Sequence, residues 1–111
     1  MGIMILFGVM PLFTACDADD PVDGLLIITV MDENNNRISS EQVYLATSYE
    51  NLKAGNYLYN GWTDENGQVT FLFLPPNYYY YDTEHYEDYG STLVYAGIEH
   101  YVILYVNTPQ P

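Results

Sequence analysis

The side chains that could do chemistry are few and widely spaced in this chain. Nucleophilic catalysis needs a Ser or Cys with a base held within hydrogen-bond reach. The single cysteine is Cys16, and the two histidines, His85 and His100, match no catalytic motif. Structural zinc sites need Cys and His clustered at short spacing, and these three residues are not so clustered. The sequence therefore predicts a protein that is not an enzyme and that has no zinc site.

Four acidic residues lie close together in the sequence between positions 82 and 88. Calcium is bound by oxygen ligands from carboxylates, amides and backbone carbonyls. This stretch lacks the spacing of an EF-hand, and a second acidic stretch at 32–34 could lie at the same end of the molecule. We weigh a candidate calcium site against an ordinary solvated acidic loop, which we favour. The candidate ligands are Asp82, Glu84, Glu87 and Asp88.

Tyrosine is over-represented, with 13 residues against four Phe and one Trp. Tyr favours strands and also binding surfaces, where one end of the ring is apolar and the other is wet. Alternation along two predicted strands turns several of these rings outward, and planar rings suit the faces of sugars. Exposed aromatic patches mark interaction sites, while ordinary cross-strand packing is the alternative that we favour. The candidate ligand-binding aromatics are Trp62, Tyr78, Tyr80, Tyr101 and Tyr105.

The charge balance excludes one class of partner. The formal net charge is −13, and the only basic residues are Arg37 and Lys53. Nucleic-acid binding depends on Lys and Arg that neutralise phosphates, so we expect no nucleic-acid partner. A strong acidic field keeps a protein soluble and suits divalent cations or basic partners.

The N-terminal segment is apolar and ends at the single cysteine. Residues 1–15 carry no charge, Cys16 follows, and the block 17–20 contains three Asp. The apolar stretch is too short to span a bilayer and has the length of a signal-peptide core. It resembles a bacterial lipoprotein signal peptide with its lipobox, which implies that Cys16 is acylated as the first mature residue. An ordinary secretory signal that leaves a free thiol, or a buried first strand, are the alternatives.

The acidic block after Cys16 can be interpreted in two ways. An Asp at the next position resembles the inner-membrane retention signal of enterobacterial lipoproteins. An acidic stretch resembles the surface-export signal of Bacteroidetes-type lipoproteins, and three Asp followed by Pro21 and Asp23 favour this second resemblance. The same run is also typical of a disordered tether. We expect an outer-membrane protein held by the lipid on Cys16, facing the cell surface, with an envelope protein or a glycan as partner.

The rest of the chain shows no helical periodicity. Short β-rich runs alternate with turn signals, which is typical of a sandwich. Asn66-Gly67 predicts a tight hairpin with both residues at positive φ, and Asn77 is free to take the same region after two prolines. We expect loops at 50–56 and 82–90. The predicted strands are 25–31, 42–49, 57–63, 68–74, 78–81, 92–95 and 99–106.

Several of these segments together resemble a known family. They are 28–34 (Ile-Thr-Val-Met-Asp-Glu-Asn), 42–45 (Gln-Val-Tyr-Leu), 63–71 (Thr-Asp-Glu-Asn-Gly-Gln-Val-Thr-Phe) and 74–79 (Leu-Pro-Pro-Asn-Tyr-Tyr). The pattern resembles the carboxypeptidase-regulatory-like and Cna-B-type domains. The resemblance implies an all-β fold, a single Ig-like or transthyretin-like antiparallel β-sandwich of about seven strands. It also implies a non-catalytic spacer, stalk, adhesive or accessory module, although a fold does not fix a function.

These observations predict four parts: a lipoprotein signal peptide at 1–15, an acidic tether at 16–24, a β-sandwich domain at 25–107 and a tail at 108–111. The predicted function is a surface-anchored lipoprotein that acts as a non-catalytic protein-binding or structural module at the cell envelope. The alternative is a carbohydrate-binding accessory lipoprotein of a glycan-uptake system. A calcium-stabilised adhesin module is a third hypothesis.

Overall fold

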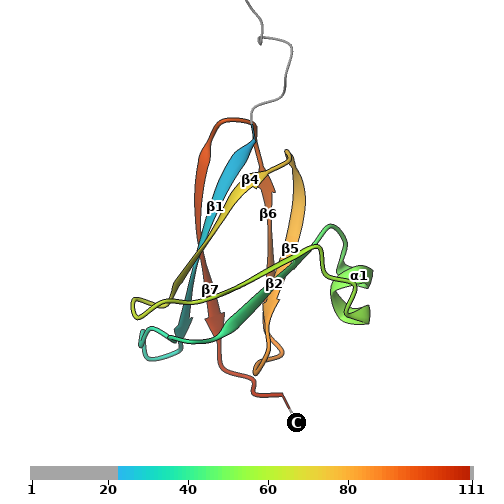
Figure 1. Ribbon diagram of the computed structural model, residues 1–111. Helices are drawn as coiled ribbons and strands as arrows, with labels where there is room; N and C mark the ends of the chain where they lie inside the picture. The colour runs from blue at the N-terminus through green and yellow to red at the C-terminus, as the bar shows by residue number, and fades with distance from the viewer. Residues whose placement is uncertain (1–22, 111) are drawn as a thin grey trace, which may run out of the picture.

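Two sheets pack face to face into a β-sandwich, as expected from the alternating strands and turns. The computed structural model describes residues 23–110, which contain seven strands and one short helix (Figure 1). Cys16, the signal peptide and all but the last residues of the predicted tether lie outside the described residues. The first sheet has the order β4-β1-β7: Gln68–Leu74, Gly24–Asp32 and Glu99–Val106. The second has the order β3-β2-β5-β6: Tyr59–Trp62, Gln42–Ala46, Asn77–Thr83 and Tyr89–Val94.

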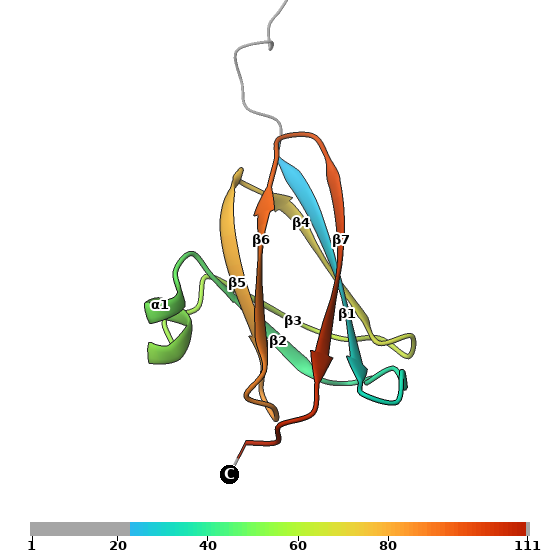
Figure 2. The same ribbon diagram turned by 180° about the vertical axis from the view of Figure 1, so that it is seen from behind.

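One strand pair departs from the antiparallel pattern. The first and last strands, β1 and β7, pair in parallel from Leu25 opposite Glu99 to Asp32 opposite Val106. The strand that precedes β7 in sequence, β6, belongs to the other sheet and runs opposite to β7, so that β7 returns in the direction of β1 (Figure 2). The fold class is confirmed as an all-β sandwich with this single parallel pair among residues 23–110.

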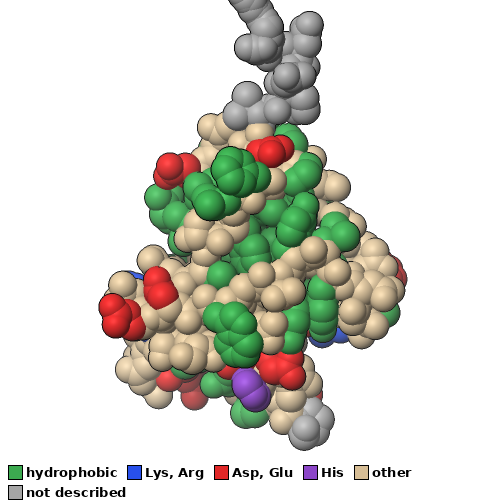
Figure 3. Space-filling model, viewed as in Figure 1, with side chains coloured by type: hydrophobic (Ala, Val, Ile, Leu, Met, Phe, Trp, Pro, Cys, Tyr) green, Lys and Arg blue, Asp and Glu red, His purple; other side chains and the backbone are tan. Residues whose placement is uncertain are grey.

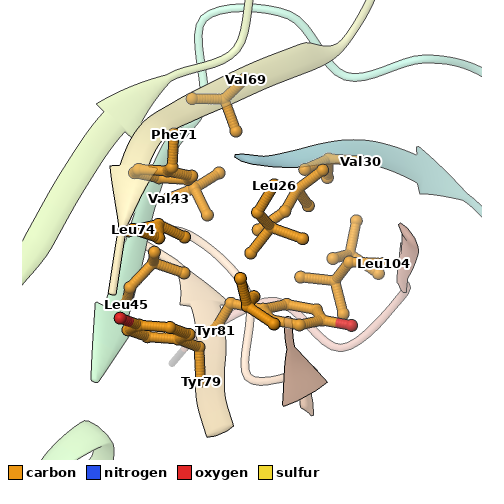
Figure 4. Close-up of a cluster of buried hydrophobic side chains, with 13 residues drawn as sticks. Leu26, Val30, Val43, Leu45, Val69, Phe71, Leu74, Tyr79, Tyr81 and Leu104 are labelled. Carbon is orange, nitrogen blue, oxygen red and sulfur yellow. The ribbon is translucent and has the colours of Figure 1, made fainter. Parts of the chain in front are cut away.

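The core lies between the two sheets and follows the predicted alternation. Side chains from both sheets point toward one another in the space between them (Figure 4). Tyr79 is also buried there, and its hydroxyl donates to the carbonyl of Pro75 at 2.6 Å. Each fully buried aliphatic or aromatic side chain contributes about 1.5–3 kcal/mol. The buried set is Leu26, Ile28, Val30, Val43, Leu45, Val69, Phe71, Leu74, Tyr79, Tyr81, Val94, Leu104 and Val106.

The prediction of a loop at 50–56 is wrong, because the structure has a helix there. Helix α1 spans Tyr49–Ala54, and it follows β2, which ends at Ala46 rather than near 49. The Ser48 side chain accepts a hydrogen bond from the Asn51 N–H at 3.0 Å, which caps the first turn. Gly55 ends the helix at φ 81°, a left-handed conformation that suits glycine. A helix of six residues is too short to show a helical period in the sequence. The only sequence signals for it are the two capping residues, Ser48 and Gly55.

The predicted loop at 82–90 is shorter than expected. Strand β5 continues to Thr83, and β6 begins at Tyr89 rather than at 92. The pairing of Tyr81 with Gly90 explains the extension, because a Cβ at position 90 would lie 2.6 Å from the Tyr81 ring. Glycine thus lets a core tyrosine pack directly onto the neighbouring strand. Asp82 therefore belongs to a strand and not to a loop.

A tight turn forms at Asn66-Gly67, but the predicted hairpin is wrong, because β3 and β4 belong to different sheets and do not pair with each other. Among the described non-glycine residues, positive φ occurs only at Asn35, Ser40 and Phe73, so Gly67 alone has positive φ (72°) in this turn. Its N–H donates to the Asp64 carbonyl at 2.9 Å, and the Asp64 N–H donates to the Gln68 carbonyl at 2.8 Å. A three-residue loop with Gly in the left-handed region has this pattern.

Near the following turn, positive φ falls on Phe73 (57°) and not on Asn77, where β5 already begins. The β1–β4 register shifts beside Phe73, since Gly24 pairs with Leu74 and Leu26 with Phe71. One extra residue on β4 makes a bulge, and the bulge turns the Phe73 side chain into solvent.

The segment after β7 runs along the loop that joins β5 to β6. Glu87 N–H donates to the Thr108 carbonyl at 2.7 Å, and Gln110 N–H donates to the His85 carbonyl at 2.9 Å. Asp88 accepts from the backbone N–H groups of Asn107 and Thr108 at 2.8 and 2.9 Å. These bonds fix the C-terminal segment against the lower edge of the second sheet.

Candidate functional site

An apolar surface covers the outer side of the first sheet. Tyr101, Ile103 and Tyr105 alternate along β7 and are 67%, 51% and 53% exposed. They lie opposite Ile27, Thr29 and Met31 of β1 in the parallel register. No helix or loop among residues 23–110 covers them. We call this surface the apolar face; it comprises Leu25, Ile27, Met31, Leu72, Tyr101, Ile103 and Tyr105.

The five candidate aromatics are divided between two sides of the sandwich. Tyr101 and Tyr105 belong to the apolar face and stand about 13 Å apart along their strand. Tyr78 (exposed) and Tyr80 (half-buried) point out from β5 on the outer side of the second sheet. Trp62 is exposed on β3, at the far edge of that sheet. The four tyrosines face outward, as the alternation predicted, but the five rings do not form one surface.

Figure 3 shows one face of the molecule, on which exposed hydrophobic side chains lie among polar side chains and backbone, acidic side chains lie mainly near the margins, and little Lys or Arg is visible. An exposed apolar area of this kind on a strongly acidic protein is typical of an interaction surface.

The four candidate calcium ligands do not form one cluster in the structure. Asp82 lies on β5 beneath α1, Glu84 accepts a hydrogen bond from the Tyr44 hydroxyl, and Asp88 binds the C-terminal backbone. Within residues 23–110, no three His, Cys, Asp or Glu side chains lie close enough together to hold a metal ion. In the other acidic turn, the Asp32 carboxylate binds the backbone of its own turn, since it accepts from the N–H groups of Asn34 and Asn36. Calcium binding stays a prediction.

Two carboxylates are buried in the described chain, and the first is Glu41. It is 5% exposed and accepts from both the backbone N–H and the ring Nδ1 of His85, at 2.7 and 3.0 Å. The hydrogen bond and the charge of Glu41 raise the pKa of His85. Glu41 also lies beside Thr63, whose hydroxyl accepts from the Glu41 N–H and donates to the Ile38 carbonyl. Glu41 therefore joins two loops to the sheet.

The second buried carboxylate is Asp82, which is 7% exposed. Within residues 23–110, its Oδ1 has no hydrogen-bond partner. Burial raises its pKa to about 6, the positive charge of Lys53 opposes this rise, and the charge of Glu84 adds to it. Burying a carboxylate oxygen that receives no hydrogen bond costs free energy. The ionised Asp82 side chain therefore lowers the stability of the folded state.

Tyrosine rings stand on both sides of Asp82. Its register partners are Tyr44 on β2 and Tyr89 on β6. Tyr57 stacks on Tyr44 with ring centroids 4.1 Å apart, and Tyr49 tilts against Tyr89 at 5.0 Å. Helix α1 lies over this side of β2 and β5 (Figure 1), with Leu52 fully buried beneath it.

A cavity of about 330 Å³ opens between α1, β5, the β5–β6 loop and the C-terminal segment. We call it the Asp82 pocket. Sequence reasoning missed it because it treated Asp82 as part of a loop and expected no helix near it. The alternation that places Asp82 on the same side as Tyr78 and Tyr80 was the available signal. The pocket is lined by Leu52, Lys53, Tyr57, Asp82, Glu87, Tyr89 and Gln110.

Comparison with known proteins identifies the fold and not a family. No family model matches the chain, and no curated protein matches it. No helix among residues 23–110 is long and apolar enough to cross a bilayer.

The solved structures that are similar to this chain include the following three. The TIE protein of Bacillus anthracis matches 91% of the chain at 21% identity and a TM-score of 0.56. The major pilin subunit BcpA of Bacillus cereus matches 79% at 18% identity and 0.55. A Pseudomonas aeruginosa protein proposed to bind carbohydrate matches 77% at 13% identity and 0.51. The chain spans only 20% and 31% of the two Bacillus proteins but 89% of the third. At these identities the likeness establishes the fold alone, a β-sandwich.

Proposed function

We propose that this protein is a lipoprotein anchored through Cys16, whose domain serves as a non-catalytic protein-binding or structural module at the cell envelope. The family proposed for the domain is the carboxypeptidase-regulatory-like or Cna-B type. The apolar face carries the proposal, because a β-sheet side with three exposed large apolar residues on one strand is typical of a docking surface. The likeness to a pilin subunit and to the TIE protein supports a structural or binding role.

The position of the first strand supports end-on anchoring. Strand β1 begins beside the β6–β7 turn, where the Leu25 N–H donates to the Ile98 carbonyl at 3.1 Å. The C-terminal segment lies at the opposite end of the sandwich (Figures 1 and 2). A tether that enters at the β6–β7 end leaves both outer sides of the sandwich free for partners.

Site-specific photo-cross-linking on intact cells tests the binding surface. A photo-cross-linking amino acid replaces Tyr101 on the apolar face or, as a matched control of similar exposure on the other sheet, Tyr78. We expect a discrete cross-linked envelope product from position 101 and not from position 78. Absence of a product at 101, or the same product at both positions, contradicts the proposal. Cys16→Ala releases the protein from the membrane if the lipid is the anchor.

Carbohydrate binding is the second candidate, and one arrangement favours it. Tyr101 and Tyr105 present two exposed rings on one sheet face, and the Pseudomonas neighbour is proposed to bind carbohydrate. A glycan array with the wild type and with the double variant Tyr101→Ser, Tyr105→Ser tests it. Binding that the double variant loses supports this candidate, whereas a silent array contradicts it.

A further inference from the structure

We propose that the Asp82 pocket binds an organic cation, a primary ammonium of the kind carried by a lysine side chain. The pocket lies on the outer side of the second sheet, opposite the apolar face, so the inference goes beyond the proposed function. It stands on three features of the pocket: a buried carboxylate, aromatic walls and a neighbouring ammonium of the protein itself.

The carboxylate supplies an unused acceptor. Asp82 is more than nine-tenths buried, lines the pocket and has an Oδ1 without a partner among residues 23–110. Glu87, a second acid, lines the same pocket. An ammonium that enters the pocket lies beside this carboxylate and offsets the cost of its buried negative charge.

The aromatic walls favour the same ligand. Tyr57 and Tyr89 line the pocket on either side of Asp82, and each is supported by a second ring, Tyr44 and Tyr49 respectively. The face of an aromatic ring attracts a cation within about 6 Å of its centroid. A carboxylate between two tyrosines therefore complements an ammonium and the apolar carbons attached to it.

The protein's own lysine demonstrates this preference. The Nζ of Lys53 lies 5.2 Å from the centroid of the Tyr89 ring and 5.6 Å from that of the Tyr49 ring. Lys53 is exposed and makes no ion pair with Asp82 within 4.0 Å in the described chain. Its flexible side chain can move aside for a ligand, but its charge repels an incoming cation. Lys53 is therefore a competitor of the ligand.

The net charge of −13 adds a long-range attraction for cations. It also makes a matched charge control necessary, because removing any carboxylate weakens cation binding slightly. Glu65 provides that control, since it is an exposed acid in the β3–β4 turn and does not line the Asp82 pocket.

The test is calorimetric titration of the full chain, in mild detergent at pH 7.5, with Nα-acetyl-lysine amide. The uncharged isostere Nα-acetyl-norleucine amide is the ligand control. We expect saturable binding of the lysine compound only. Asp82→Asn should weaken it at least tenfold, Tyr57→Leu about threefold, and Glu65→Gln less than twofold. Lys53→Gln should tighten it severalfold by removing the competing charge.

Three outcomes overturn the proposal: equal binding of the norleucine compound, an equal loss in Glu65→Gln and Asp82→Asn, or weaker binding in Lys53→Gln. The last result indicates a ligand that needs the Lys53 donor, such as a sugar hydroxyl or an anion. Amide NMR spectra of each variant report whether it folds. If Asp82→Asn does not fold, the Tyr57→Leu and Lys53→Gln variants decide the matter.

Discussion

The two buried carboxylates, Glu41 and Asp82, differ in what the fold does for them. Glu41 is 5% exposed and receives two hydrogen bonds from His85, whereas Asp82 is 7% exposed and has an oxygen without a partner. Both lie beside the β5–β6 loop, so the same short segment satisfies one acid and leaves the other unsatisfied. A satisfied buried acid stabilises the native structure, and an unsatisfied one is retained at a cost. The difference points to a ligand for Asp82 and to a structural role for Glu41.

Removing the Glu41 carboxylate should have the largest effect on stability. Glu41→Ala leaves the His85 backbone donor without its acceptor and opens a space beside Thr63. We expect the free energy of unfolding to fall by about 2–4 kcal/mol, as measured by urea denaturation at pH 7. Glu41→Gln retains one acceptor oxygen and should cost less. An unchanged urea midpoint in Glu41→Ala would show that the His85 bonds contribute nothing.

Removing the Asp82 charge should act in the opposite direction. Because the pKa of Asp82 is raised from 3.8 to about 6, its neutral form is favoured in the folded state. The contribution of Asp82 to stability is therefore most favourable below pH 3.8 and is lost as the pH rises through about 6. The shift corresponds to roughly 3 kcal/mol at most.

We accordingly expect Asp82→Asn to be more stable than the wild type by about 1–3 kcal/mol at pH 8 and nearly equal to it at pH 4. Urea denaturation at both pH values measures the difference. A variant that is less stable at pH 8 would mean that Asp82 has a partner after all.

The Glu41–His85 pair should give a smaller effect of known sign. The hydrogen bond to Glu41 raises the pKa of His85 above 6.5. The stabilisation by this pair is therefore complete below pH 6.5. It is lost as the pH rises through the raised value. We expect the urea midpoint of the wild type to fall between pH 6 and 9, and the same curve to be flatter for His85→Gln. A steeper fall in the variant would contradict this. Salt should weaken the effect, since the ring is exposed.

An exposed acid should change stability least. Glu84→Gln replaces the charged acceptor of the Tyr44 hydroxyl with a neutral amide oxygen, and the free energy of unfolding should change by less than about 0.5 kcal/mol. The pKa of Tyr44, raised to about 12 chiefly by its hydrogen bond to Glu84, should fall toward 10. Ultraviolet titration of the tyrosines measures it. A loss of stability as large as in Glu41→Ala would remove the distinction between buried and exposed acids.

Much of the sandwich could be predicted from local patterns. Alternation along the last strand predicted that Tyr101 and Tyr105 face outward, as they do, because every second side chain of a strand faces the same way. The segment from Thr63 to Gly67 was recognisable because its chemistry is local: Asp64 accepts from the N–H groups of Asn66 and Gln68 within one turn. That recognisable segment supports the fold and does not line the Asp82 pocket.

The Asp82 pocket could not be predicted in the same way. It is built by α1, two strands and the C-terminal segment, which are distant in sequence. Its helix has only six residues, so tertiary packing decided it rather than periodicity. Asp82 itself follows a run of tyrosines and precedes an acidic stretch, and composition alone assigned it to a loop. Only the three-dimensional structure shows that Asp82 Oδ1 lacks a hydrogen-bond partner among residues 23–110.

Carboxyl-carbon NMR titration of the wild type, with Asp82→Asn to assign the signal, tests most directly whether Asp82, unlike Glu41, is an unsatisfied buried acid. We predict that the Asp82 carboxyl titrates with a pKa of about 6 and that bound Nα-acetyl-lysine amide lowers this value. A pKa at or below 3.8, unchanged by the amine, would show that Asp82 is already satisfied and would contradict the account.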